Sequence, residues 1–287
     1  MTSAGYRQNS QGIFQPQEAV VHRDDEYDPA GFDVLWDMQR SHFWYHGRHR
    51  FLHHEVRRRL GGRAGLCAVD LGGGCGGWVN YLINHEPELF QQAALADSSL
   101  AALERAGELL PATIQRFQVD LLKLGWEEVW DAAFLLDVLE HLPDDGLALR
   151  EAGRAVKPGG HVFVTMPALN FFWSYNDEVA HHQRRYSKGD LARLAEAAGL
   201  RLISARYFMF FLSPLLWLSR LRPGMARLGS EEKARLAARA HRVPGRLTNA
   251  VLSGVFGAET PVGHVLPFPW GTSILGVFQK PGRPIVG

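Results

Sequence analysis

The chain contains 287 residues, 31 of them basic and 30 acidic, which gives a formal net charge of +1 at pH 7. So balanced a charge provides no field to hold a nucleic acid, and we expect no nucleic-acid partner. The two cysteines, Cys67 and Cys75, are too few for a disulfide framework and favour a reducing compartment.

Two further features of the sequence predict a cytoplasmic protein. Residues 1–17 are polar and lack the apolar segment of a signal peptide. The longest apolar run, residues 207–219, contains Pro214, and its roughly 13 residues are too few to span a bilayer. We therefore expect no transmembrane segment.

The N-terminal part is predicted to be a mobile tail followed by two helices. Residues 1–26 are rich in Gln, Ser, Gly and charged side chains, a composition typical of disordered tails. Apolar residues recur at helical spacing from about residue 30 and again from about residue 46, and Gly61-Gly62 ends the second pattern. Residues 27–62 are thus predicted to form a helical cap.

Alternating strand and helix patterns occupy residues 63–207, and a final strand is expected in residues 271–287. Repeated βα units of this kind predict an α/β fold with a Rossmann-like, doubly wound, mostly parallel sheet of seven strands. The expected strands cover residues 66–71, 93–97, 113–118, 131–136, 161–166, 201–207 and 272–279.

Residues 208–270 are predicted to be a helical insertion before the last strand. They contain an apolar helix over 208–222, an exposed helix over 230–242 and a second apolar segment over 246–256. Together with the N-terminal cap, this insertion is expected to roof the ligand end of the sheet, as lids do. The apolar helix also fits a lipid-like acceptor or a membrane-surface contact, although packing of the lid is the favoured explanation.

A glycine-rich loop after the first core strand predicts a cofactor site. Backbone N–H groups at the start of the following helix would face the ligand, and glycine allows it to approach the backbone. Gly72-x-Gly74-x-x-Gly77 satisfies the dinucleotide fingerprint, with Asp97 at the spacing of a ribose-binding acid. Asp70, however, would repel a pyrophosphate two residues before the first glycine and would attract a cationic cofactor.

Four acidic residues end four successive predicted strands: Asp70, Asp97, Asp120 and Asp137. Each alone would be explained as a helix cap or a solvated loop residue. Ligands bind at the carboxyl ends of the strands in open α/β sheets, so four acids there indicate a shared site. Asp97 suits both hydroxyls of a ribose, and Asp120 suits the amino group of an adenine.

Together these motifs resemble the class I S-adenosylmethionine (SAM)-dependent methyltransferases, specifically a bacterial small-molecule type with Asp137-x-x-Glu140-His141 after the fourth strand. The resemblance covers residues 64–207 and the final strand. It implies SAM as cofactor, with Arg48 on its carboxylate and Trp44 or Tyr45 over its sulfonium, although these side chains would also serve to pack the N-terminal helices. The cofactor-binding residues that it implies are Trp44, Arg48, Asp70, Gly72, Gly74, Gly76, Asp97, Ser98, Asp120, Leu121 and Asp137.

Methyl transfer requires alignment of the nucleophile with the methyl carbon, worth roughly 7–11 kcal/mol, and removal of a proton when the acceptor is a hydroxyl group. Histidine suits that proton transfer. The candidate catalytic residues are His141, His181, His182 and Tyr175, although a structural hydrogen bond explains each histidine equally well. We predict O-methylation of a small molecule, such as a lipid-like compound, a sugar or a natural-product intermediate, with S-adenosylhomocysteine (SAH) as product.

Two other functions and a metal site are the alternatives to this prediction. A nicotinamide-dependent oxidoreductase would explain the glycine loop but not Asp70, and an inactive partner subunit would not need so complete a set of cofactor residues. His42 and His46, and His49 and His53, are spaced four residues apart on one helix face. Because no acid or cysteine completes such a site at a fitting spacing, we predict no metal.

Overall fold

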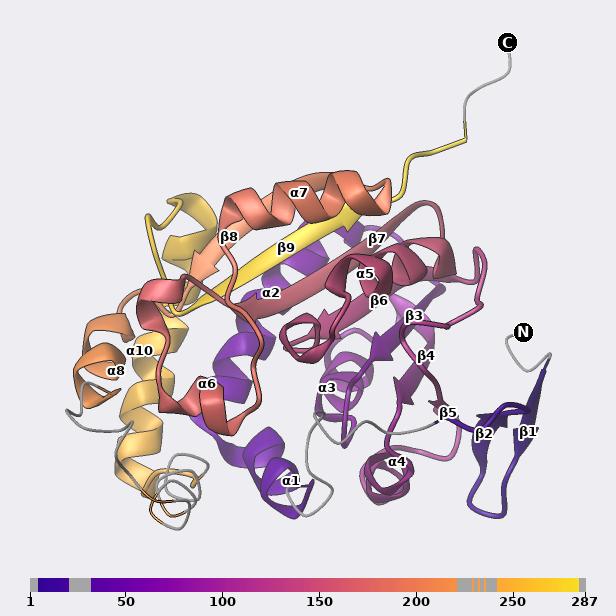
Figure 1. Ribbon diagram of the computed structural model, residues 1–287, viewed down its shortest axis with the longest axis horizontal. Helices are drawn as coiled ribbons and strands as arrows, with labels where there is room; N and C mark the ends of the chain where they lie inside the picture. The colour runs from indigo at the N-terminus through magenta and orange to yellow at the C-terminus, as the bar shows by residue number, and fades with distance from the viewer. Residues whose placement is uncertain are drawn as a thin grey trace.

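The computed structural model describes residues 5–20, 32–220, 229, 232, 235 and 242–283. Within this part of the chain a single sheet of nine strands runs in the order β1-β2-β5-β4-β3-β6-β7-β9-β8 (Figure 1). The pairs from β2 to β7 are parallel, and β9 lies antiparallel between β7 and β8. The strands are β1 (Tyr6–Gln8), β2 (Ile13–Pro16), β3 (Leu66–Leu71), β4 (Phe90–Asp97), β5 (Gln115–Gln118), β6 (Trp130–Leu136), β7 (Val156–Pro167), β8 (Arg201–Phe208) and β9 (Ser273–Gln279).

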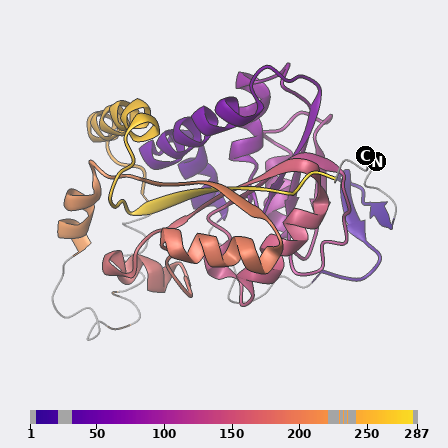
Figure 2. The same cartoon turned by 90° about the horizontal axis from the view of Figure 1, so that it is seen from above.

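Helices cover both faces of this sheet. Figure 2 shows α2 and α10 on one face and α5 and α7 on the other, which confirms the predicted doubly wound α/β fold. The helices are α1 (Phe32–Ser41), α2 (Phe43–Leu60), α3 (Gly77–His85), α4 (Leu100–Ala106), α5 (Asp145–Ala155), α6 (Tyr175–Val179), α7 (Lys188–Ala198), α8 (Ser213–Arg220) and α10 (Arg246–Val265), with 3₁₀ turns η2 (Leu139–His141) and η3 (Asn170–Phe172).

The central strands have apolar side chains on both faces because helices bury them from both sides. Phe134 of β6 and Phe163 of β7 stack with their ring centroids 5.2 Å apart and are fully buried. They belong to the core beneath α2 and α10, which also contains Trp78 of α3. On the opposite face, α5 and α7 bury Leu149 and Leu191 in a second core. The sheet is therefore held rigidly, with its strand ends free to build a site.

The prediction of a mobile tail over residues 1–26 was wrong for residues 5–20, which the structure describes. β1 and β2 form an antiparallel hairpin, and β2 pairs parallel to β5, which adds two strands to the predicted seven. Ile13 is fully buried in the core of α3 and α4, and Phe14 stacks on Phe117 with ring centroids 5.0 Å apart. Burial of these side chains against the edge of β5 outweighs the polar composition of the segment. Residues 21–26 lie outside the described residues.

The insertion before β9 also differs from its predicted helices. β8 extends to Phe208, so the apolar helix begins later than expected, as α8. α10 runs to Val265, past Pro261, whereas its pattern predicted an end near residue 256. Packing explains the extra turns, because they contain two buried residues with distant partners. Glu259 accepts a hydrogen bond from the Phe211 N–H at 2.9 Å, and the His264 Nε2 donates one to the Phe51 carbonyl of α2 at 2.9 Å. The exposed helix expected over 230–242 falls almost entirely outside the described residues.

None of the described helices combines the length and the apolar character that are needed to cross a bilayer.

Candidate active site

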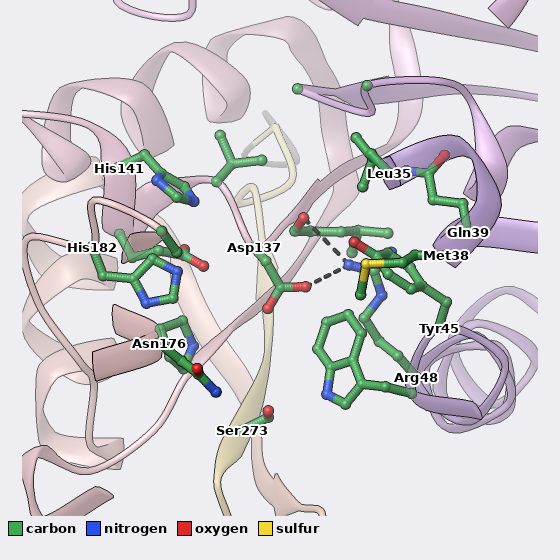
Figure 3. A pocket seen from close by; sticks show the side chains of 18 of the residues that line it. Leu35, Met38, Gln39, Tyr45, Arg48, Asp137, His141, Asn176, His182 and Ser273 are labelled. Carbon is green, nitrogen blue, oxygen red and sulfur yellow. Dashed lines mark hydrogen bonds and ion pairs between the residues drawn. The ribbon is translucent and has the colours of Figure 1, made fainter. Parts of the chain in front are cut away.

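A cavity of about 570 Å³ opens at the carboxyl ends of the parallel strands, where α/β sheets bind their ligands. The glycine loop, the first turns of α2 and the loops after β4, β5 and β6 contribute to its wall, and α1 and α6 lie at its sides. Figure 3 shows Met38, Tyr45 and Arg48 on one side, His141 and His182 on the other, and Asp137 between them.

The glycine loop passes directly under this cavity. Gly72 and Gly74 line it and have φ angles of +76° and +57°, a conformation that residues with a side chain rarely adopt. Gly76 differs from the prediction, because it lies behind the loop at the N-cap of α3, where a Cβ would meet Leu110 at 2.7 Å. Gly76 therefore shapes the loop and does not face the ligand.

Asp70 lies at the base of the cavity, at the end of β3, with 2% of its surface exposed. Its Oδ1 atom has no hydrogen-bond partner among the described residues. Burial is the largest cause of a raised pKa of this carboxyl group; Arg48 lowers the pKa and Asp97 raises it, and the result is about 7. A buried acceptor of this kind fits a ligand that brings a positive charge.

Asp97 holds the glycine loop in place. Its Oδ2 accepts a hydrogen bond from the Gly74 N–H at 2.8 Å, and its Oδ1 accepts one from the Ser99 N–H at 2.9 Å. Ser98, Asp120 and Leu121 line the same part of the cavity. The predicted contact of Asp97 with a ribose thus comes together with a structural role.

Arg48 joins the N-terminal helices to the end of β6. Only 4% of its surface is exposed, and its guanidinium forms an ion pair with Asp137. The rings of Trp44 and Tyr45 each lie 5.0 Å from the guanidinium carbon, within reach of cation–π attraction. Asp137 also accepts a hydrogen bond from Thr165 at 3.1 Å and has a φ of +59°. Backbone strain of this kind is concentrated at functional sites, and both residues of the pair line the cavity.

Two of the three candidate histidines meet on the opposite side of the cavity. His141 and His182 line it with their ring centroids 4.9 Å apart, and Tyr175 lines it from α6. Burial, with the neighbouring His182 and His181, lowers the pKa of His141 to about 3, so its ring is neutral at pH 7. His181 is exposed and lies outside the cavity lining, so the structure does not bring it together with the other two histidines.

His182 is oriented by a buried carboxylate. Its Nδ1 donates a hydrogen bond to Asp177 at 2.9 Å, and Arg185 donates two more to the same carboxylate, at 2.8 and 3.0 Å. Although burial opposes ionisation, these bonds lower the pKa of Asp177 to about 2. The neighbouring Arg184 forms its ion pair with a different acid, Asp145.

A sequence profile described as "Methyltransferase domain" matches residues 43–205, more than half of the chain and the part that builds this cavity. The chain belongs to the methyltransferase-domain family.

Curated relatives match about half of this chain. A ubiquinone biosynthesis O-methyltransferase from Alkalilimnicola ehrlichii is 31% identical over 145 residues, which cover 48% of this chain and 58% of that protein. A trans-aconitate 2-methyltransferase from Azoarcus sp. is 32% identical over 148 residues, covering 51% and 55%. The chain thus spans less than two thirds of the length of these relatives.

Solved structures share its fold at low identity. Phosphoethanolamine N-methyltransferase 2 from Haemonchus contortus, in complex with SAM, superposes with a TM-score of 0.57 at 17% identity, over 93% of this chain and 62% of that one. The YcgJ protein from Bacillus subtilis gives 0.52 at 14% identity, over 81% and 99%. These likenesses confirm the Rossmann-like architecture.

Several residues that line the cavity were not predicted as part of the site. Leu35, Met38 and Gln39 of α1 line it, and the Gln39 Oε1 accepts the Gly77 N–H at 3.1 Å. Asp177 and Glu140 were visible in the sequence as acids near the histidines, but no spacing rule joins residues so far apart along the chain. The Asp-x-x-Glu-His pattern was the one signal that pointed at Glu140.

Proposed function

We propose that this methyltransferase transfers a methyl group from SAM to a hydroxyl oxygen of a small-molecule acceptor and releases SAH. The observation that carries the proposal is Asp70, a buried carboxyl group with an unpartnered oxygen at the base of the cavity. SAM brings an ammonium group that supplies the missing partner, and the sulfonium adds a second positive charge nearby.

The residues around Asp70 support SAM over a dinucleotide. Asp97 lies close enough to raise the pKa of Asp70, so two carboxyl groups surround the glycine loop that a pyrophosphate would have to approach. In the proposed complex the loop at Gly72 and Gly74 holds the methionine end. Asp97 and Ser98 hold the ribose, and Asp120 with Leu121 holds the adenine.

The acceptor is assigned to the opposite side of the cavity. His141, His182 and Tyr175 provide polar groups there, while Met209 and Leu216 make the adjoining wall apolar. The apolar surface continues outside the cavity on α8, where Leu215 and Leu218 are 57% and 62% exposed. This arrangement suits an acceptor that combines a hydroxyl group with an apolar portion. The names of the ubiquinone-pathway relatives, which specify O-methylation, agree with it.

Calorimetric titration with SAM, SAH and NAD tests the cofactor. We expect micromolar binding of SAM and SAH, no binding of NAD, and at least a tenfold weaker SAH affinity for Asp97→Asn. Asp190→Asn is the matched control, because Asp190 accepts backbone and hydroxyl hydrogen bonds from Ser187 on α7, outside the cavity lining. Absence of SAM and SAH binding would overturn the proposal, whereas binding without methyl transfer to any hydroxylated acceptor would indicate the inactive partner subunit.

The pKa of Asp70 predicts that SAH binding releases protons. With a pKa of about 7 against an ordinary 3.8, the folded protein binds more protons than the unfolded chain between about pH 4 and 7, so this group makes the unliganded protein less stable as pH rises. The ammonium of SAH favours the carboxylate, and affinity should therefore increase up to about pH 7 and then level off.

Titration at pH 6 in two buffers with different ionisation enthalpies measures this release. The apparent binding enthalpies of the wild type should differ in proportion to the buffer enthalpies, and those of Asp70→Asn should agree. Equal enthalpies for the wild type would show that Asp70 is already ionised before SAH binds.

A further inference from the structure

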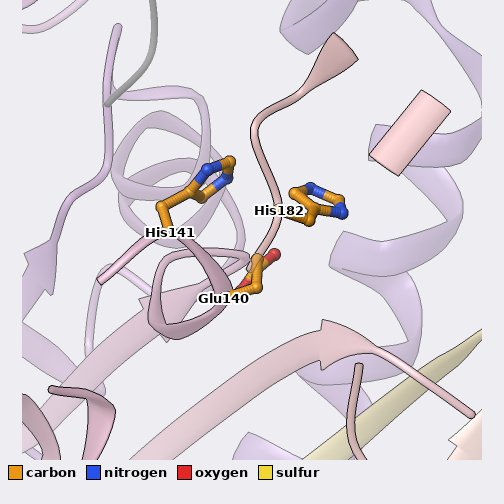
Figure 4. Close-up of side chains that lie close together, drawn as sticks. All are labelled: Glu140, His141 and His182. Atoms are coloured by element: carbon orange, nitrogen blue, oxygen red, sulfur yellow. The ribbon is translucent and has the colours of Figure 1, made fainter. Parts of the chain in front are cut away.

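Three side chains with metal-binding atoms converge on the acceptor side of the cavity. Glu140, His141 and His182 each present one such atom, and the three atoms lie within 4.8 Å of one another. Figure 4 shows the two rings and the carboxylate facing a common point. They come from separate segments, η2 after β6 and the loop after α6.

Two of these side chains lack the partners that buried polar groups normally have. Glu140 is fully buried, and neither of its carboxylate oxygens has a hydrogen-bond partner among the described residues. The Nδ1 of His141 is buried without a partner in the same part of the chain. A buried carboxylate is stable only when a cation, a donor or a proton compensates it. One divalent cation would satisfy both side chains at once.

The surroundings hold the donor atoms in position. Asp177 accepts the Nδ1–H of His182, and a histidine bound in this way presents its other nitrogen as a lone pair, as metal-binding histidines do. Gln183 joins the two segments, since its backbone N–H donates to the Glu140 carbonyl at 2.8 Å and its Nε2 donates to the His141 carbonyl at 2.9 Å. The cluster is therefore built in advance of any ligand.

We propose that Glu140, His141 and His182 bind one divalent transition-metal ion, such as Zn²⁺, Mn²⁺ or Fe²⁺. Two imidazoles and one carboxylate suit these ions better than Mg²⁺ or Ca²⁺, which prefer oxygen donors. Three protein ligands leave coordination positions open toward the cavity, as in catalytic metal sites. This proposal differs from the prediction that the chain binds no metal, because that prediction rested on the histidines of the N-terminal helices.

The role of the ion in catalysis rests on the proposed function. A coordinated acceptor hydroxyl has a lowered pKa and loses its proton to solvent. An oxygen lone pair then forms the new bond to the methyl carbon, while the carbon–sulfur bond breaks and its electron pair stays on the sulfur of SAH. Asp177 is a positioning residue in this scheme, because it acts through His182.

Metal binding is tested directly on the full-length chain. After treatment with a chelator, the protein is dialysed against micromolar Zn²⁺ or Co²⁺, and bound metal is measured by elemental analysis and by the visible absorption of Co²⁺. We expect one ion per chain for the wild type and an affinity at least tenfold lower for Glu140→Gln and His182→Ala. His181→Ala is the matched control and should bind as the wild type does.

SAH titration of the same variants separates this inference from the proposed function. Glu140→Gln and His182→Ala should keep SAH affinity within about threefold, because neither side chain is assigned to the cofactor; this result also shows that the variants are folded. The metal site would be overturned if the wild type bound less than roughly 0.1 ion per chain, about a tenth of the occupancy of a complete site. An equal loss of metal affinity in His181→Ala and His182→Ala would also overturn it. The imidazoles would then remain as proton acceptors without a metal.

Discussion

Replacing Arg48 with methionine is expected to destabilise the protein by about 3 kcal/mol and to abolish measurable SAH binding. The substitution removes one partner of a buried ion pair and leaves Asp137 without its cation, and losses of this kind cost about 3–5 kcal/mol. Arg48 also opposes the raised pKa values of Asp70 and Glu140, so three acids lose their compensating charge together. Chemical denaturation gives the stability, and calorimetry gives the affinity.

Arg57→Met is the control for that experiment. Arg57 lies on the same helix, α2, but its side chain is 67% exposed, and its loss should change stability by less than about 0.5 kcal/mol. Arg48→Lys keeps the charge but not the planar guanidinium between Trp44 and Tyr45, so an intermediate loss is expected. Wild-type stability and SAH affinity in Arg48→Met would show that the ion pair with Asp137 is not part of the working site.

The second large effect is expected for Gly73→Ala in the glycine loop. A Cβ at this position would lie 2.3 Å from the Asp70 Oδ2 and 2.6 Å from a methyl group of Leu95. Since both neighbours are buried at the ends of β3 and β4, relief of the clash requires movement of the cavity base, at about 1–3 kcal/mol. We expect at least a hundredfold weaker binding of SAH, measured by calorimetry.

Gly189→Ala serves as the comparison for this variant. Gly189 lies in the first turn of α7, and a Cβ there meets only the Ser187 hydroxyl at 3.6 Å, an ordinary contact. Alanine favours helix, so this variant should be as stable as the wild type or more so. If Gly73→Ala binds SAH as tightly as Gly189→Ala does, the loop is not the cofactor cradle.

The sheet could be predicted from the sequence because its strands are short apolar runs between helical patterns. Each of those patterns is local, and the acids and glycines at the strand ends follow from the same local order. The hairpin of β1 and β2 could not be predicted, since only its position beside Phe117 makes Ile13 and Phe14 core residues. The extra turns of α10 likewise depend on a distant segment, since His264 pairs with the carbonyl of Phe51 on α2.

The site could be predicted only where all the residues that identify it lie in one short segment of the sequence. The glycine loop, with Asp70 before it, is such a segment. Arg48 and Asp137 are distant along the chain, as are Glu140 and His182, so the residue types could be recognised in the sequence but their partners could not. Burial then changes the chemistry of these groups, as the raised pKa of Asp70 shows.

The place of β9 in the sheet has a consequence for synthesis of the chain on the ribosome. β9, residues 273–279, is the last of the described strands along the chain. In the sheet, however, it lies between β7 and β8, which both precede it in the sequence. Until those residues emerge, β8 has no neighbour and β7 exposes an unpaired edge, a surface prone to pairing with other chains. Thr272 and Ser273 also line the cavity. A nascent or truncated chain that stops before them would have the glycine loop but neither a continuous sheet nor a complete cavity wall.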